Sequence, residues 1–208
     1  MMDDTQRLER FNQIKENLES EGYSAKVCTI SVLKANVMAF VLAGPLAIVC
    51  WLIFCIVRQP TEFEFGGMGT SLFFLAFLIS IFIHEALHGL TWGLFCKNGF
   101  KSIKLGMMWK VLTPYCACAE PLNFTQYFLG ALMPFFVLGL GAFFVALATK
   151  SIACLAFSML SMLAAGGDIT IVCMLLKYRK AKALFADHPT ECGFYAFVKE
   201  EKESSDEI

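Results

Sequence analysis

This chain has no excess of basic residues, no recognisable secretory signal and no regular cysteine framework. Its 17 lysines and arginines face 18 acidic residues, so a net charge of −1 offers no basic field for nucleic acid. The nine cysteines are odd in number and scattered through apolar runs, which argues against a disulfide scaffold. The first residues are Met-Met-Asp-Asp, and the first apolar run begins only near Asn36. We therefore expect an internal span to direct insertion into the membrane.

Apolar residues are abundant instead. Hydrophobic residues make up 57% of the 208 residues, well above the share in a soluble domain. Runs of about 20 residues with almost no charge are long enough to cross roughly 30 Å of hydrocarbon. We predict an all-α membrane protein whose core, residues 34–176, contains about four transmembrane helices. The predicted spans are 36–57, 71–96, 127–149 and 151–176.

The segments outside this core are polar. In residues 1–33, apolar residues recur at helical spacing between Asp4, a candidate cap, and Gly22, a candidate end. These apolar residues are Leu8, Phe11, Ile14 and Leu18. They predict an amphipathic helix on the membrane surface or on the rest of the protein, with a solvated helix as the alternative. The tail, residues 177–208, is polar and ends in acidic residues, which predicts a disordered end.

Lysines alternate with apolar residues between the second and third spans. This alternation runs from Lys101 to Val111, and Pro114 and Pro121 interrupt the sequence that follows. A period of two is typical of extended strands. We therefore predict a small β-hairpin or re-entrant element at the membrane surface.

Lysine and arginine counts predict the orientation. The N-terminal segment, the loop from Lys97 to Lys110 and the tail after Leu176 are basic, whereas the loops at Arg58 and Lys150 each contain one cation. Basic loops stay on the cytoplasmic side. Four spans with both termini in the cytoplasm satisfy this rule.

The second predicted span contains His84-Glu85-Ala86-Leu87-His88, in a chain that has only three histidines. Residues four apart on a helix share a face, so His84 and His88 can bind one Zn²⁺ together. Glu85 can then act as general base on a water molecule at the metal. The alternative is a chance motif on a polar helix face. An ionisable group in hydrocarbon costs about 2.5–3.5 kcal/mol, which weakens that alternative.

A catalytic zinc site usually has three protein ligands and an open fourth position. Asp168 is the only charged residue of the fourth predicted span. It precedes Lys177 by as many residues as His88 precedes Lys97, so both lie roughly 13 Å from one membrane boundary at 1.5 Å per residue. We predict Asp168 as the third ligand. The alternative is a carboxyl group that pairs with a lysine or stays protonated.

Other residues could donate to a metal but fit less well. Glu120 could reach the site only through a re-entrant loop. Cys116 and Cys118 form a Cys-x-Cys sequence, which is not the usual zinc spacing. His188 is typical of a solvated tail residue, with a plug over the site as the lesser alternative.

The His84-Glu85-x-x-His88 sequence in one span and Gly167-Asp168 in a later one resemble the site-2 protease group of intramembrane zinc metalloproteases. His-Glu-Ala-Leu-His-Gly, Tyr-Cys-Ala-Cys-Ala-Glu-Pro-Leu, Met-Pro-Phe and Gly-Gly-Asp-Ile resemble bacterial membrane proteins described as zincin peptidases. The resemblance implies that His84, His88 and Asp168 bind zinc and that Glu85 is the base. It also implies a bacterial cytoplasmic membrane. Asp168 is followed by Ile169, whereas better-known site-2 proteases often have Asp-Gly there.

These features predict a zinc metallopeptidase that cleaves membrane proteins or membrane-associated peptides within the lipid bilayer. An extended substrate could pair with the edge of the predicted hairpin. A non-catalytic metal-binding membrane protein, such as a sensor, chaperone or transporter component, would need the same ligands without Glu85 as a base. A structural or transport bundle would need no metal at all.

Overall fold

The computed structural model describes residues 4–58, 67–108 and 113–199. Helices dominate it, and three of them are long and apolar enough to cross a membrane: Leu33–Arg58, Gly67–Phe95 and Phe124–Thr149. A bent pair of shorter helices counts as a fourth if it forms one span. The chain thus has three or four candidate spans, close to the positions that the apolar runs predict.

The long helices follow from predominantly apolar sequence, and the third of them is interrupted. α2 (Val32–Arg58) contains Pro45, and α3 (Gly67–Phe95) carries the histidine motif. The third span begins as α4 (Phe124–Pro134), continues as a π-helical segment, η2 (Phe135–Gly141), and ends as α5 (Ala142–Thr149). Asn123 and Gln126 form a capping box that fixes where α4 begins.

The fourth predicted span is not one continuous helix. α6 (Ile152–Ala164) and α7 (Gly166–Leu175), which η3 (Leu176–Tyr178) extends, are bent by 43° at Ala165. The two glycines that follow Ala165 have low helix propensity. Gly166 also lies so close to Ala39 of α2 that a Cβ would collide with it. Close packing of α2 against this bend is therefore possible only with glycine.

The fold is mostly helical, as predicted, but it departs from the all-α class in a four-stranded antiparallel sheet. Its order is β1-β6-β5-β4, and it joins both ends of the described chain. The strands are β1 (Tyr23–Thr29), β4 (Leu122–Asn123), β5 (Ala183–Asp187) and β6 (Gly193–Lys199). Within the predicted polar tail, residues 183–199 are ordered, and Phe185, Phe194 and Phe197 are fully buried there. The acidic end that was predicted to be disordered lies outside the described residues.

α1 (Asp4–Ser20) packs on this sheet. Its residues Phe11 and Leu18 are buried in a cluster with Ala186 and Phe197. Gly22, with φ of +83°, follows the helix end in a conformation that favours glycine. Of the predicted alternatives, the helix therefore adopts the one in which it lies on the rest of the protein.

A second sheet of two strands follows α3. After the short 3-10 helix η1 (Gly99–Ser102), β2 (Ile103–Met108) pairs antiparallel with β3 (Thr113–Cys118). These strands are extended, as the alternation predicts. Trp109, Lys110 and Val111 lie outside the described residues.

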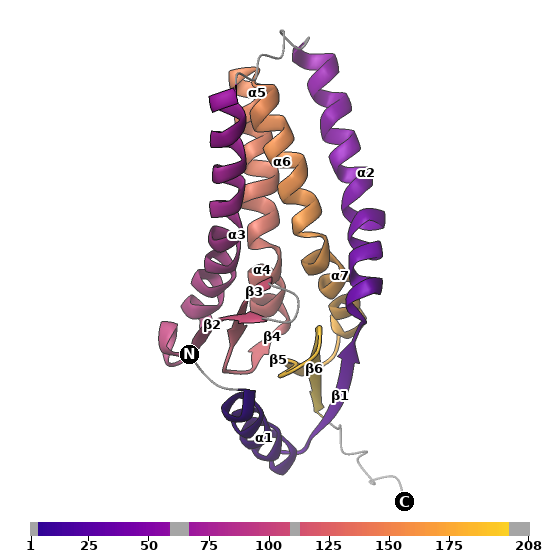
Figure 1. Ribbon diagram of the computed structural model, residues 1–208. Helices are drawn as coiled ribbons and strands as arrows, with labels where there is room; N and C mark the ends of the chain where they lie inside the picture. The colour runs from indigo at the N-terminus through magenta and orange to yellow at the C-terminus, as the bar shows by residue number, and fades with distance from the viewer. Residues whose placement is uncertain (1–3, 59–66, 109–112, 200–208) are drawn as a thin grey trace, which may run out of the picture.

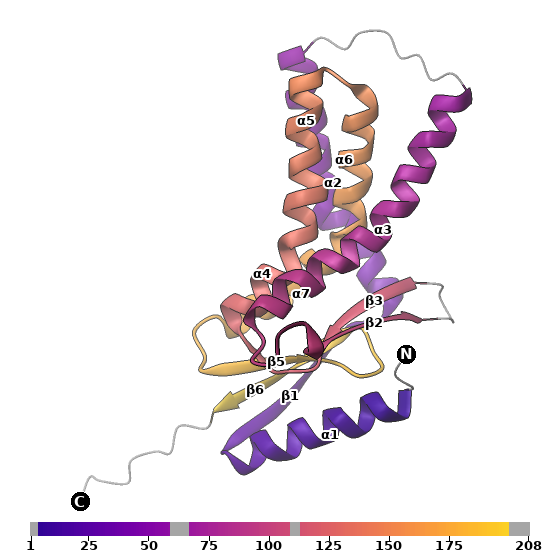
Figure 2. The same cartoon turned by 90° about the vertical axis from the view of Figure 1, so that its left-hand side faces the viewer.

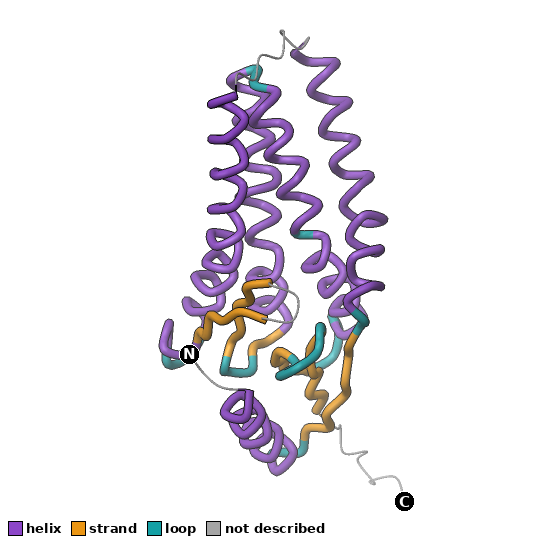
Figure 3. Tube along the Cα trace, in the orientation of Figure 1, coloured by secondary structure: helices purple, strands orange, loops and turns teal. Residues whose placement is uncertain are grey.

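The two sheets and α1 gather at one end of the molecule, and the long helices extend away from it (Figure 1). The trace coloured by secondary structure shows all described strands at this end (Figure 3). In the turned view, α3 diverges from α5 and α6 with distance from the sheets (Figure 2). The basic segments of the chain therefore share one end, and its assignment to the cytoplasm stays a prediction.

Candidate metal centre

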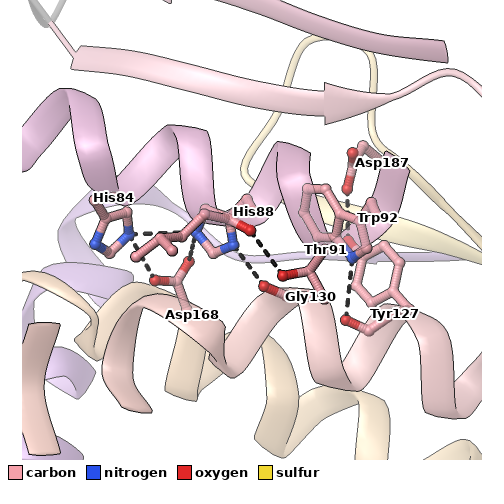
Figure 4. Close-up of polar contacts among 9 residues, drawn as sticks. His84, His88, Thr91, Trp92, Tyr127, Gly130, Asp168 and Asp187 are labelled. Atoms are coloured by element: carbon pink, nitrogen blue, oxygen red, sulfur yellow. Dashed lines mark hydrogen bonds and ion pairs between the residues drawn. The ribbon is translucent and has the colours of Figure 1, made fainter. Parts of the chain in front are cut away.

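Three side chains predicted from the sequence lie together where α3 passes α7. His84 Nε2 is 3.0 Å from Asp168 Oδ2, and His88 Nε2 is 3.4 Å from Asp168 Oδ1. The two Nε2 atoms are 3.2 Å apart (Figure 4). Among the described residues, this is the one group of three or more His, Cys, Asp or Glu side chains whose ligand atoms all lie within 4.8 Å.

These separations fit a single zinc ion. Ligand atoms at about 2.0–2.1 Å from a tetrahedral ion are about 3.4 Å from one another. The observed 3.0–3.4 Å is close to that edge length. Two imidazole nitrogens and one carboxylate are also a donor set that leaves a fourth position for water or substrate. The residues present therefore suit zinc.

The His88 ring is fixed by its second nitrogen. Nδ1 lies 2.8 Å from the carbonyl oxygen of Gly130 on α4. A carbonyl can only accept, so Nδ1–H donates, and in the neutral ring Nε2 then keeps its lone pair towards Asp168 and His84. His88 is 5% exposed, so water does not compete for this bond.

Asp168 enters the group through the bend between α6 and α7. It occupies the first turn of α7, where the helix dipole attracts negative charge. His84 and Asp168 are partly buried, with side chains 13% and 24% exposed. The centre thus has a closed side at His88 and a more open side at His84 and Asp168.

Glu85 lies beside this group, under the hairpin. The backbone N–H of Cys116 on β3 lies near its carboxylate. The hairpin can approach α3 because Gly89 has no side chain: a Cβ there would be 2.8 Å from Cγ2 of Ile103 and 3.1 Å from Sγ of Cys116. The role of Glu85 as a base stays a prediction.

Glu120 does not join the metal group. Its carboxylate accepts hydrogen bonds from the backbone N–H groups of Lys97 and Asn98 and from the side chains of Asn98 and Ser102. Burial alone would raise the pKa of Glu120, but these hydrogen bonds hold it below its usual range. Glu120 therefore stabilises the turn that follows α3 through these hydrogen bonds.

The remaining candidates also lie elsewhere. His188 stacks on Tyr195 at 5.0 Å, and its Nδ1 accepts from the backbone N–H groups of Thr190 and Glu191. Burial lowers the pKa of His188. Sγ of Cys118 is 3.0 Å from Sγ of Cys96, and burial raises the pKa of the Cys116 and Cys118 thiols. None of these residues belongs to the metal group within the described chain.

Sequence reasoning missed the residues that surround His88. Trp92 follows His88 by one helical turn, and this spacing could have indicated a shared face. Tyr127 and Asp187, which lie behind Trp92 (Figure 4), carry no such local signal. They approach α3 only because β5 and α4 pack against each other.

Comparison with known proteins agrees with this site. Residues 77–183 match the family model described as "Putative zincin peptidase". This match includes His84, Glu85, His88 and Asp168. No curated protein and no solved structure matches the chain. Because the family model covers just over half of the 208 residues, the chain belongs to this zincin peptidase family, which implies zinc as its metal.

Proposed function

We propose that this protein is an intramembrane zinc metallopeptidase that hydrolyses peptide bonds of transmembrane or membrane-associated substrates. The observation that carries the proposal is the meeting of His84, His88 and Asp168 between two apolar helices. Burying ionisable side chains such as these in hydrocarbon is energetically unfavourable, and a bound cation would offset that free-energy cost.

His84, His88 and Asp168 would hold the ion, with the Gly130 carbonyl fixing the tautomer of His88. Zinc supplies Lewis acidity there, which polarises a carbonyl group and makes water a nucleophile near neutral pH. Glu85 takes the proton of the attacking water and passes it to the leaving amine. The Cys116 N–H, which lies near the Glu85 carboxylate, would favour its charged, proton-accepting form.

The β2–β3 hairpin is our candidate for substrate binding. It is a two-stranded sheet, so each strand has an edge that can accept an extended peptide. A transmembrane helix must unwind before cleavage, and pairing with this edge would replace the backbone hydrogen bonds that it loses. Because β3 lies over Glu85, the bound peptide would be close to the centre.

Proline scanning tests this substrate site. Successive residues of an edge strand point their N–H groups alternately towards the partner strand and away from it. Lys104→Pro and Leu105→Pro each remove one N–H group, and only one of these two groups points away from the partner strand. We expect the variant that lacks this outward N–H to keep the hairpin folded and to cleave a transmembrane reporter more slowly. Unchanged cleavage in both variants would remove the hairpin from the proposal.

Glu85→Gln tests the reaction itself. In proteoliposomes, the variant should keep zinc at the wild-type stoichiometry and lose cleavage of a reporter that the wild type cleaves. Full activity in Glu85→Gln would exclude Glu85 as the base. Zinc-loaded wild type that cleaves no membrane peptide would instead favour a non-catalytic metal-binding protein.

We also propose that the sheet end faces the cytoplasm, since it contains the basic segments. A membrane-impermeant thiol reagent tests this side at Cys192, which lies in the β5–β6 loop. Labelling in inverted vesicles and not in intact cells supports this orientation, and the reverse result contradicts it.

A further inference from the structure

The second support of the His88 ring comes from an aromatic stack. The His88 and Trp92 rings are nearly parallel, at 15°, with centroids 5.2 Å apart. The Gly130 carbonyl restrains His88 at Nδ1, and the indole covers one face of its ring (Figure 4). An imidazole held at an edge and on a face cannot rotate away from the metal position without moving Trp92.

Trp92 is itself held by α4. Its Nε1–H donates to the backbone carbonyl of Tyr127 at 3.3 Å, and the two rings stack at 5.5 Å. Trp92 is 5% exposed. Gly130 leaves the space that the indole fills, because a Cβ at that position would overlap the indole ring. Gly130 therefore restrains His88 through its carbonyl and also makes room for the ring that stacks on His88.

The four-stranded sheet completes this support through Asp187, at the end of β5. The Tyr127 hydroxyl donates to Asp187 Oδ1 at 2.6 Å, and the Cys118 backbone N–H donates to Oδ2 at 3.0 Å. One carboxylate thus fixes the aromatic ring behind Trp92 and also the end of β3. The same strand packs on α3, where Cys116 lies close to Gly89.

We propose that Trp92, Tyr127 and Asp187 are positioning residues that hold His88 in the orientation needed at the metal centre. The proposal rests on the proposed zinc site but not on peptide cleavage. It gives the C-terminal strands a part in the chemistry, although Asp187 lies beyond the residues that match the family model. Asp187 acts through Tyr127 and Trp92 and does not touch the metal group.

The chain contains a matched control for Tyr127. Tyr178 also packs against Phe185 and Phe194, and its hydroxyl lies 3.2 Å from Cys28 Sγ on β1. Both tyrosines therefore join the helices to the sheet through a ring and a hydroxyl. Of these two tyrosines, Tyr127 is the one that stacks on Trp92.

The experiment compares Tyr127→Phe, Asp187→Asn and Tyr178→Phe in the full chain in nanodiscs. Zinc affinity is measured by competition with a chelator, and the ligand geometry by the absorption spectrum of bound Co²⁺. Outer partners of a metal ligand typically change affinity 10–100-fold. We expect about 10-fold weaker binding and a shifted Co²⁺ spectrum for the first two variants. Tyr178→Phe should stay within about twofold of wild type, with similar thermal midpoints for all three variants.

Wild-type zinc affinity and Co²⁺ spectrum in Tyr127→Phe would overturn the proposal, and so would an equal loss in Tyr178→Phe. Trp92→Phe and Trp92→Ala give a second comparison. Phe keeps a flat ring against His88 and should retain most of the zinc affinity that Ala loses. Equal affinities in these two variants would show that stacking has no positioning role. Because metal binding is the measurement, absent peptidase activity would contradict the proposed function alone.

Discussion

The two halves of α3 meet different surroundings. Its outer half, from Gly67 to Ile83, exposes large apolar side chains, among them Leu72, Phe74, Leu75 and Leu78. Its inner half, from His84 to Phe95, buries side chains of the motif face against α4 and the hairpin. Figure 2 shows the reason: with distance from the sheets, α3 separates from the neighbouring helices α5 and α6.

The two halves of α3 place different requirements on their sequences. Lipid tails can cover any apolar side chain, so the outer half needs hydrophobicity and length. The inner half must match particular partners: His88 a carbonyl, Trp92 a stacked ring and Gly89 a strand at close range. Substitutions should therefore have large effects in the inner half and small ones in the outer half.

The largest effect is expected for His88→Ala. The variant loses a metal donor and leaves the Gly130 carbonyl without its partner, which costs about 1–3 kcal/mol in a buried site. We expect zinc to fall from about one ion per chain to almost none, as measured by elemental analysis of purified protein. Zinc retained at the wild-type level would refute the metal centre.

A pair of glycines sharpens the comparison within the same helix. Gly89→Ala places a methyl group against Ile103 and Cys116, and such overpacking typically costs about 1–3 kcal/mol. Gly67→Ala meets no atom within 4 Å. We expect a lower thermal midpoint and reduced cleavage for Gly89→Ala only. Equal midpoints would mean that the hairpin does not need its close approach to α3.

Glu120 gives a smaller, pH-dependent effect at the inner end of α3. Its pKa is lower in the folded chain, so it stabilises the fold above its unfolded pKa, near 4.3. This contribution, up to about 1 kcal/mol at a partly exposed position, is lost as pH falls through the folded pKa. At pH values below about 4.3, the thermal midpoint of wild type should decrease as the pH is lowered. In Glu120→Gln, the midpoint should depend less on pH in this range. An identical profile in both proteins would contradict the role of the carboxylate.

The smallest effect is expected for Leu78→Ala in the outer half. Leu78 is 56% exposed, and in a membrane span lipid tails would cover its exposed part. The variant should change stability by less than about 0.5 kcal/mol and leave zinc content unaltered. A loss as large as that of Gly89→Ala would show that the outer half packs against a protein surface.

The difference between the two halves also explains what could be read from the sequence. The apolar runs predicted the long helices within a few residues, because helix length and hydropathy are local properties. Spacing placed His84 and His88 on one face, and a charge inside an apolar run drew attention to Asp168. Their roles as zinc ligands, with Glu85 as base, stay predictions.

Tertiary structure decided the rest. Asp187 meets Tyr127 across 60 residues of sequence, and β1 pairs with β6 from the opposite end of the described chain. Strand pairing and aromatic stacking join residues whose own neighbours give no sign of the partner. The sequence by itself determined the three long apolar helices and the helix face that carries the two histidines. Only the folded chain could determine which carbonyl, ring and carboxylate hold those donors in place.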